Sequence, residues 1–286
     1  MMNLICNICN SKDVYFFTEK NSCRLCKCRK CGLIFVDNAY EEAKIYSEDY
    51  FVGAKEGFGY VNYEKDKSAM DWTFKAYLKQ IEKFLPGKGR LLDVGAATGY
   101  FLERAKQAGW EVAGVEISEY ASSKAREKGL KVINGTLKDL KDSKNSFDAM
   151  TFLDSIEHLP NARADLLIAR KLLKKDGIIV INTPDAGSLL AKILGRRWQH
   201  LVPPEHLAIF NQKNLAKLLK ECGFKVLFVD KIGKKFTLQY IAHVISIWSK
   251  LKLALKLADS LRNNSLGNIA MPLNLRDNFF VIARKV

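Results

Sequence analysis

The stretch Leu91-Leu92-Asp93-Val94-Gly95-Ala96-Ala97-Thr98-Gly99 decides the fold, because a short buried strand runs there directly into a glycine-rich turn. A helical pattern follows at 100–108 and ends at Gly109. Glycine lets the backbone of such a turn approach a ligand closely, and the N-terminus of the next helix favours a negative group. The stretch therefore predicts a ligand-binding turn after the first strand of an α/β sheet.

Strand and helix patterns alternate along the rest of the chain. Repeated strand–helix units of this length predict a mostly parallel sheet with helices on both faces. The predicted strands are 90–94, 111–117, 131–134, 147–153, 177–182, 224–230 and 278–286, and the predicted helices are 64–85, 100–108, 119–128, 162–174 and 211–222.

Two common phosphate-binding motifs do not fit this turn. A dinucleotide fingerprint needs G-x-G-x-x-G, but Ala97 and Tyr100 stand at its second and third glycine positions. No Gly-Lys-Ser/Thr follows, so a P-loop is excluded. The pattern that remains is D-x-G-x-A-x-G, with Glu116 at the end of the next strand, where a carboxylate can accept both hydroxyls of a ribose.

This pattern resembles the class I S-adenosylmethionine-dependent methyltransferases. In that family the turn reads D-x-G-x-G-x-G, so Ala97 is a departure. The resemblance continues through further segments, which are Asn134-Gly135-Thr136-Leu137 after the third strand, Ser146-Phe147-Asp148-Ala149-Met150 at the entry to the fourth, Phe152-Leu153-Asp154-Ser155-Ile156-Glu157-His158-Leu159 after it, and Leu172-Leu173-Lys174-Lys175-Asp176-Gly177 before the fifth.

The resemblance implies a Rossmann-like sheet of seven strands whose last strand is antiparallel, and S-adenosylmethionine as the cofactor. Thr136 stands where the family usually has an acidic residue near adenine, which weakens that one contact. The cofactor-binding residues implied by the match are Asp93, Gly95, Ala97, Gly99, Tyr100, Glu116, Ile117, Thr136, Leu137 and Asp154.

Six of the seven cysteines lie within the first 31 residues. Cys6-x-x-Cys9 and Cys28-x-x-Cys31 have the paired spacing of a four-thiolate zinc site, which leaves no open position and is therefore structural. Cys23-x-x-Cys26 is an alternative second pair, but only Cys28/Cys31 is followed by Gly32 and a strand-like Leu33–Val36. A disulfide cluster is less expected without a secretory signal. Cys222 reads as an ordinary buried thiol.

A narrower subgroup of the family also joins a zinc ribbon to the methyltransferase domain. The segment Pro203-Pro204-Glu205-His206-Leu207, after the fifth strand, resembles that subgroup, whose members accompany glycan and lipid-saccharide assembly enzymes. The resemblance implies a small-molecule or glycan acceptor, such as a sugar nucleotide or a lipid-linked saccharide.

Methyl transfer to a hydroxyl needs a base. The candidate catalytic residues are Asp154, His158 and His206, with Glu205 beside them, because they follow the fourth and fifth strands at the carboxyl edge of the sheet. Structural roles remain open alternatives: a cap or loop support for His158 and an anchor of the Pro-Pro turn for His206. His200 is expected at the rim and His243 in a structural position. Tyr46, Tyr50 and Phe51 are either a lid over the cofactor or core residues.

These observations divide the chain into four parts. Residues 1–40 form the zinc ribbon, 41–85 a helical lead-in or lid, 86–232 with 278–286 the methyltransferase domain, and 233–277 a helical insertion.

The charge leaves a choice of partners. Forty-six Lys and Arg against 31 Asp and Glu give a net charge of +15, which favours a polyanionic partner or an acidic substrate. One alternative is an RNA methyltransferase that uses the basic ribbon. Another is a membrane-surface protein that has lost catalysis, since residues 231–262 carry seven basic residues, one acidic residue and many apolar ones. The same segment also fits a helical cap over the active site whose charged face is solvated. The longest apolar run, 236–249, is too short to span a bilayer, so a cytoplasmic protein, with peripheral contact to anionic membrane, is expected.

Overall fold

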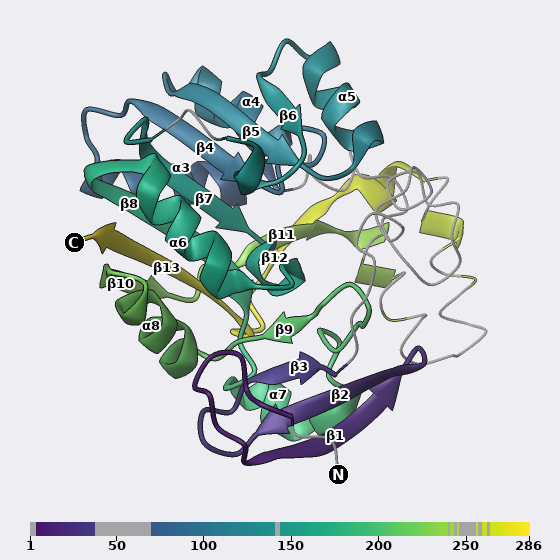
Figure 1. Cartoon of the computed structure of the whole chain (residues 1–286). Coiled ribbons are helices and arrows are strands. Elements are labelled where there is room, and N and C mark those ends of the chain that lie inside the picture. Colours follow the sequence, from purple (N-terminus) through teal and green to yellow (C-terminus); the bar gives the residue numbers. More distant parts are fainter. Residues whose placement is uncertain are drawn as a thin grey trace.

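The computed structural model describes residues 4–37, 70–140, 144–239, 241–242, 245, 256, 259–261 and 264–286. Its centre is a seven-stranded sheet with the order β10-β13-β8-β7-β4-β5-β6 (Figure 1). The bounds of these strands are β4 Arg90–Val94, β5 Glu111–Glu116, β6 Val132–Asn134, β7 Phe147–Leu153, β8 Leu173–Pro184, β10 Phe224–Asp230 and β13 Asn278–Lys285.

The strand directions make this a mixed sheet. β4 pairs in parallel with both β5 and β7, β5 pairs in parallel with β6, and β7 pairs in parallel with β8. β13 runs antiparallel to its two neighbours, β8 and β10. The predicted seven-stranded mixed sheet is therefore confirmed. Helix α6 ends two residues earlier than predicted, because the chain turns at Leu173 directly into a longer β8.

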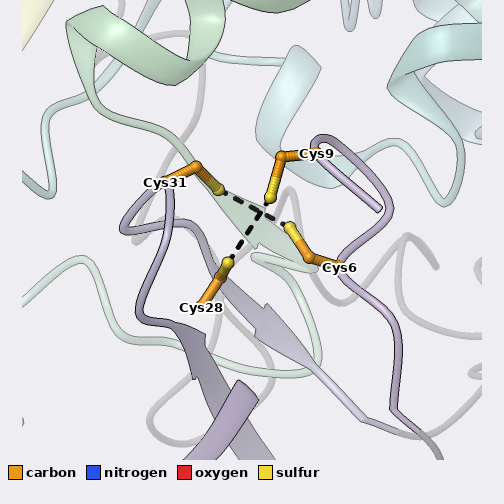
Figure 2. Close-up of side chains that lie close together, drawn as sticks. All are labelled: Cys6, Cys9, Cys28 and Cys31. Carbon is orange, nitrogen blue, oxygen red and sulfur yellow. Dashed lines mark hydrogen bonds between the residues drawn. The ribbon is translucent and has the colours of Figure 1, made fainter. Parts of the chain in front are cut away.

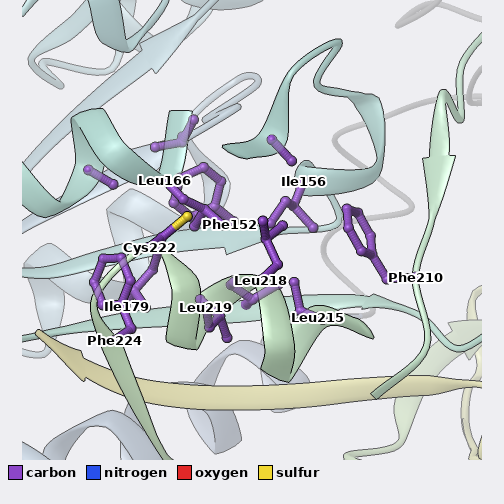
Figure 3. Close-up of a cluster of buried hydrophobic side chains, with 14 of the residues drawn as sticks. Phe152, Ile156, Leu166, Ile179, Phe210, Leu215, Leu218, Leu219, Cys222 and Phe224 are labelled. Carbon is purple, nitrogen blue, oxygen red and sulfur yellow. The ribbon is translucent and has the colours of Figure 1, made fainter. Parts of the chain in front are cut away.

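Helices cover both faces of the sheet. On one face α6 and α8 bury a core with Phe152, Ile179 and Leu218 at its centre (Figure 3). On the other face α3 and α4 pack through Phe74, Tyr77 and their neighbours. The helix bounds are α3 Asp71–Phe84, α4 Tyr100–Gln107, α5 Glu119–Glu127, α6 Ala162–Leu172, α7 Leu189–Leu194 and α8 Gln212–Glu221, with short 3-10 turns at Leu137–Asp139, Ile156–His158, Gly195–Arg197 and Ser265–Asn268.

The N-terminal cysteine-rich segment forms a second sheet that includes a strand from the segment between β8 and α8. Strands β1 (Val14–Lys20), β2 (Cys23–Cys28) and β3 (Ile34–Val36) are antiparallel, and β3 pairs in turn with β9 (Ala208–Ile209) (Figure 1). A small core joins the two segments, with Leu25 and Ile34 packed in the same cluster as Trp198 and Leu201. The ribbon is thus built into the segment that follows β8.

The insertion before β13 differs from the prediction. We predicted a helical segment over 233–277, but its two ends pair as antiparallel strands β11 (Lys234–Thr237) and β12 (Ala270–Leu273). Helical positions occur between them, at 238–239 and 259–261 for example. The strand segment Lys234-Lys235-Phe236-Thr237 is too short to show either a helix or a strand period, so its sequence does not reveal the pairing.

The predicted lid residues Tyr46, Tyr50 and Phe51, and also His243, lie outside the described residues. Among the helices that the structure describes, none combines the length and the apolarity needed to cross a membrane.

Candidate active site

The turn after β4 has the conformation that its glycines predict. Gly95 and Gly99 have φ values of +78° and +81°, and Ala97 has φ +47°, also in the left-handed region. A Cβ on Gly95 would lie 2.9 Å from Cβ of Ser155, which follows β7. Only a glycine therefore lets the turn pass this close to the neighbouring strand end.

Glu116 lies at the carboxyl end of β5 and organises the turn. Its carboxylate oxygens accept hydrogen bonds from the backbone N–H of Ala97, at 2.8 Å, and of Ser118, at 2.9 Å. Burial raises the pKa of Glu116, and these two backbone hydrogen bonds oppose that shift. The arrangement keeps two carboxylate oxygens at the edge of the turn, where further lone pairs can accept ribose hydroxyls.

The other predicted cofactor residues lie along the same edge of the sheet or beside it. Asp93 is buried in β4 and accepts a hydrogen bond from the Thr151 hydroxyl of β7. Thr136 caps the turn after β6 together with Asp139, and Leu137 is buried under that turn. Tyr100 opens α4, and its ring lies under the Arg104 guanidinium. Their contacts with a cofactor stay a prediction.

His158 and His206 meet although 47 residues separate them in the chain. Their ring centroids are 4.9 Å apart, with an edge-on geometry. Nδ1 of His158 lies 2.8 Å from the carbonyl oxygen of Glu205, and Nδ1 of His206 lies 2.7 Å from that of His200. A carbonyl oxygen only accepts, so Nδ1 carries the proton in each ring and Nε2 is the basic nitrogen.

Both imidazoles are in surroundings that favour the neutral form. Burial lowers the pKa of His158, and it lowers the pKa of His206 further below its ordinary value, with an added contribution from His158 itself. Neutral rings of this kind can take a proton or bind a cation. The pairing of the two predicted candidates in one place is the main structural support for a reactive site here.

Asp154 is held by an ion pair that the sequence did not reveal. Nζ of Lys234, on β11, lies 2.8 and 2.7 Å from its two carboxylate oxygens. The Asn182 side chain also donates to it, and Asp154 itself has φ +55°. A carboxylate stabilised by a lysine is a weak base, so these contacts favour a positioning role.

Glu157 is a site residue that we did not single out, although it stands in the Glu-His-Leu segment. It is 1% exposed, and the Thr183 hydroxyl donates to it at 2.8 Å. Burial, with a contribution from Asp154, raises the pKa of Glu157 to about 8. Its ligand oxygen and the ring nitrogens of His158 and His206 lie within 4.8 Å of one another.

His200 is tied to the end of the insertion. Its Nε2 lies 3.3 Å from a carboxylate oxygen of Asp277, which also accepts from Trp198 Nε1. Burial would raise the pKa of Asp277, but the hydrogen bonds from His200 and Trp198 lower it overall. These contacts fix one side of the segment that carries His206, and no local sequence pattern signals them.

The predicted cysteine set comes together as a tight group. Cys6, Cys9, Cys28 and Cys31 have ligand sulfurs within 4.8 Å of one another (Figure 2). Sγ of Cys6 and Cys31 are 3.6 Å apart, and those of Cys9 and Cys28 are 3.5 Å apart, so no disulfide joins them. A hydrogen bond from Cys31 lowers the pKa of Cys6 to about 5.

The remaining cysteines lie elsewhere. Cys23 and Cys26 are buried in β2 and are not members of the group of four, and the thiol of Cys23 donates to the carbonyl of Asn21. Cys222 is buried in the core beneath α8, as predicted.

A seven-stranded sheet whose first strand ends in this turn and whose second ends in Glu116 is the arrangement expected of an S-adenosylmethionine-dependent methyltransferase. The family model of the methyltransferase domain matches residues 69–229, more than half of the chain. The chain belongs to that family.

Two proteins similar in sequence are an uncharacterized protein and an O-methyltransferase. The chain is 29% identical over 163 residues to protein MJ1123 of Methanocaldococcus jannaschii, a match that covers 57% of this chain and 77% of the relative. It is 30% identical over 152 residues to the ubiquinone biosynthesis O-methyltransferase of Alkalilimnicola ehrlichii, which covers 46% of this chain and 61% of that enzyme. The chain thus spans less than two thirds of this enzyme.

Solved structures share the fold. A SAM-dependent methyltransferase of Thermotoga maritima superimposes with a TM-score of 0.53 at 21% identity, over 86% of this chain and 99% of that one. A second one, from Archaeoglobus fulgidus, gives a TM-score of 0.51 at 22% identity, over 75% and 94% of the two chains.

Proposed function

We propose that the protein transfers a methyl group from S-adenosylmethionine to a hydroxyl of a small molecule or glycan. The observation that carries this proposal is the meeting of His158 and His206 at the edge of the sheet where Glu116 ends β5. Glu116 and His158 are close enough to affect each other's pKa. The name O-methyltransferase of the ubiquinone relatives also supports an oxygen acceptor.

The residues of the chain have to bind and orient the cofactor and the acceptor, and to remove the proton of the acceptor hydroxyl. S-adenosylmethionine supplies an electrophilic methyl group when bound. Glu116 and the glycine turn would hold its ribose and its amino-acid end, and positioning of this kind is worth about 7–11 kcal/mol. The neutral His158 and His206 would receive the hydroxyl proton, directly or through a bound group, while Asp154 and Lys234 hold the insertion against the site.

The glycan class rests on two features together. The cysteine ribbon and the Pro203-Pro204-Glu205-His206-Leu207 segment resemble a subgroup that accompanies glycan assembly enzymes. In the structure these two features are joined, because the N–H of Val36 in β3 donates to the carbonyl of Leu207. A ribbon attached to the segment Pro203–Leu207, which carries His206, is suited to shaping a pocket for the acceptor.

We also propose that the four cysteines bind one structural zinc ion. A zinc–sulfur distance of about 2.3 Å in a tetrahedron places the sulfurs about 3.8 Å apart. The separations of 3.5 and 3.6 Å are close to that value, so the donor set fits the ion. Four thiolates leave no position for substrate, which makes the site structural.

We further propose peripheral contact with anionic membrane or an acidic substrate rather than RNA, in line with the net charge of +15. On the ribbon the cations Arg24, Lys27 and Arg29 lie over the rings of Phe16, Phe17 and Tyr15, respectively. Rings that already carry a cation over one face are poorer stacking platforms for bases.

The test is methyl transfer from radiolabelled S-adenosylmethionine into a cell extract that is then separated into lipid, nucleotide-sugar, small-molecule and RNA fractions. Label in the lipid or nucleotide-sugar fraction supports the glycan proposal, and label in another small molecule keeps the reaction but changes the acceptor. Label that ribonuclease removes would overturn the proposed acceptor class. A Glu116→Ala chain serves as the control, since it keeps the acceptor side and should lose cofactor binding.

A further inference from the structure

Glu157, His158 and His206 form a second group of metal-type ligands, distinct from the cysteines. One carboxylate oxygen and one nitrogen from each ring lie within 4.8 Å of one another. The group combines the 3-10 turn after β7 with the segment before β9, so it exists only in the folded chain.

Both rings are oriented as metal-binding histidines are. Nδ1 of His158 donates to the carbonyl of Glu205, and Nδ1 of His206 donates to the carbonyl of His200. Such a hydrogen bond fixes the tautomer and makes Nε2 the ligand nitrogen. The two rings lie 4.9 Å apart, and in each of them Nε2 is the nitrogen whose lone pair can bind a metal ion.

The carboxylate is fixed in the same way. Glu157 accepts a hydrogen bond from the Thr183 hydroxyl of β8 and is almost fully buried. Its backbone carbonyl accepts from the N–H of Leu207, which ties the Glu157 turn to the His206 segment.

We propose that Glu157, His158 and His206 bind one divalent transition-metal ion. Two histidines and one carboxylate leave coordination positions open, as in catalytic zinc sites and in two-histidine, one-carboxylate iron sites. A four-thiolate site has no open coordination position, so the ion in the ribbon would be structural, whereas the ion at Glu157, His158 and His206 could bind a substrate atom.

The role of this ion rests on the proposed function. The ion would hold the acceptor oxygen at the edge of the sheet and favour loss of the hydroxyl proton to water. The oxygen lone pair then forms the bond to the methyl carbon while the carbon–sulfur bond breaks, and that electron pair stays on sulfur. With the ion bound, His158 and His206 serve as its ligands, and this role replaces the direct proton acceptance of the proposed function.

Cobalt(II) is the probe that separates the two sites. The full chain, purified with its ribbon loaded with zinc, is titrated with Co²⁺, and bound metal is counted by elemental analysis. Cobalt at His and Glu ligands shows visible d–d absorption, whereas cobalt in the ribbon would add strong thiolate charge-transfer absorption in the near ultraviolet. The expected result is one cobalt per chain without the thiolate band.

Four variants locate the ion. His158→Ala and His206→Ala should each weaken cobalt binding by more than about 100-fold, because second-shell changes alone cost about 10–100-fold. Thr183→Val changes only the partner of Glu157 and should weaken binding about 10–100-fold. The control is Glu111→Gln, a carboxylate that pairs with Arg90 at the opposite end of β5 and is not in the ligand group, and it should keep the cobalt.

The proposal is overturned if the wild-type chain takes up no cobalt beyond the ribbon, or if both His158→Ala and His206→Ala keep it. Thermal melts and S-adenosylmethionine binding show which variants are folded, and Thr183→Val tests the site even where an alanine variant is not. Cobalt binding is measured without substrate. A failed methyl-transfer assay with cobalt bound therefore overturns the proposed function alone.

Discussion

Replacing Glu116 with glutamine tests the centre of the cofactor site with almost no change in shape. In the structure one carboxylate oxygen accepts from Ala97 N–H and the other from Ser118 N–H. A glutamine has one acceptor oxygen, so its NH₂ group must face one of these two backbone donors. The turn then loses a charge-assisted hydrogen bond and leaves a buried N–H without an acceptor.

The size of the effect follows from these contacts. A hydrogen bond to a charged group contributes about 1.5–3 kcal/mol. If the same carboxylate accepts the ribose hydroxyls, cofactor binding loses a similar amount, and the Kd for S-adenosylmethionine should rise about 10–150-fold. The unliganded chain should also be less stable, by about 1–3 kcal/mol, because one buried donor is unsatisfied.

Isothermal titration calorimetry measures the Kd, and chemical denaturation measures the stability. Glu111→Gln is the matched control, because Glu111 begins the same strand at its opposite end and pairs with Arg90 at the surface. It should leave the Kd unchanged. A Glu116→Gln chain that binds S-adenosylmethionine within about threefold of the wild type would refute the assignment of Glu116 to the ribose.

Four further predictions test other parts of the argument. Gly99→Ala should lower the free energy of unfolding in denaturant by about 1–3 kcal/mol, since Gly99 has φ +81° and an added Cβ would overlap the Leu130 side chain; equal stability would contradict this. Lys234→Met should lower the free energy of unfolding by about 1–2 kcal/mol, because the partly buried Asp154 loses its cation. An unchanged unfolding curve would show that the ion pair does not contribute to stability. The pKa of Asp277 is lower in the folded chain than in the unfolded chain, where it is about 3.9. The ionised carboxylate therefore stabilises the fold above that pH, and this stabilisation is lost as the pH falls through the pKa of the folded chain. Asp277→Asn should therefore flatten the fall of Tm with pH below about pH 4, and parallel wild-type and variant curves would contradict that assignment. Cys31→Ser should abolish methyl transfer while the Kd for S-adenosylmethionine stays near the wild-type value, and a loss of both would show that the ribbon supports the whole fold.

The sheet and its first turn were predictable because their signals are local. The run Leu91–Val94 is apolar enough to be buried on both faces, and the glycines after it allow the positive φ values that the turn requires. The same holds within each Cys-x-x-Cys pair, whose spacing sets its local geometry, while the β1–β2 pairing brings the two pairs together. The residues of these features therefore lie where the sequence indicates, although the cofactor and metal that they would hold remain proposals.

The contacts that complete the site join distant segments, and no periodicity reveals them. The ion pair of Lys234 with Asp154 spans 80 residues, and it depends on a strand pair that we expected to be helical. Glu157 was visible in the Glu-His-Leu segment, but its burial beside Thr183 only became apparent in three dimensions. A sequence pattern reports the periodicity of a single helix or strand, whereas the packing of several helices and strands places these side chains.

The ribbon and the segment that carries His206 form one structural unit, so the proposed zinc site would act on the proposed active site through these contacts. The backbone carbonyl of Cys31 accepts hydrogen bonds from the side chains of Asn211 and Asn214 at the start of α8. β3 pairs with β9, which begins two residues after His206. Leu207, between His206 and β9, accepts a hydrogen bond from the N–H of Val36 and donates its own N–H to the carbonyl of Glu157. A metal ion at the cysteines would hold this strand in place, because structural metal sites contribute directly to the folding free energy of small domains. The segment carrying His206 is therefore fixed from one side by the ribbon and from the other by Asp277 through His200. Rigid support on both sides is what a site that aligns an acceptor oxygen with a methyl group requires.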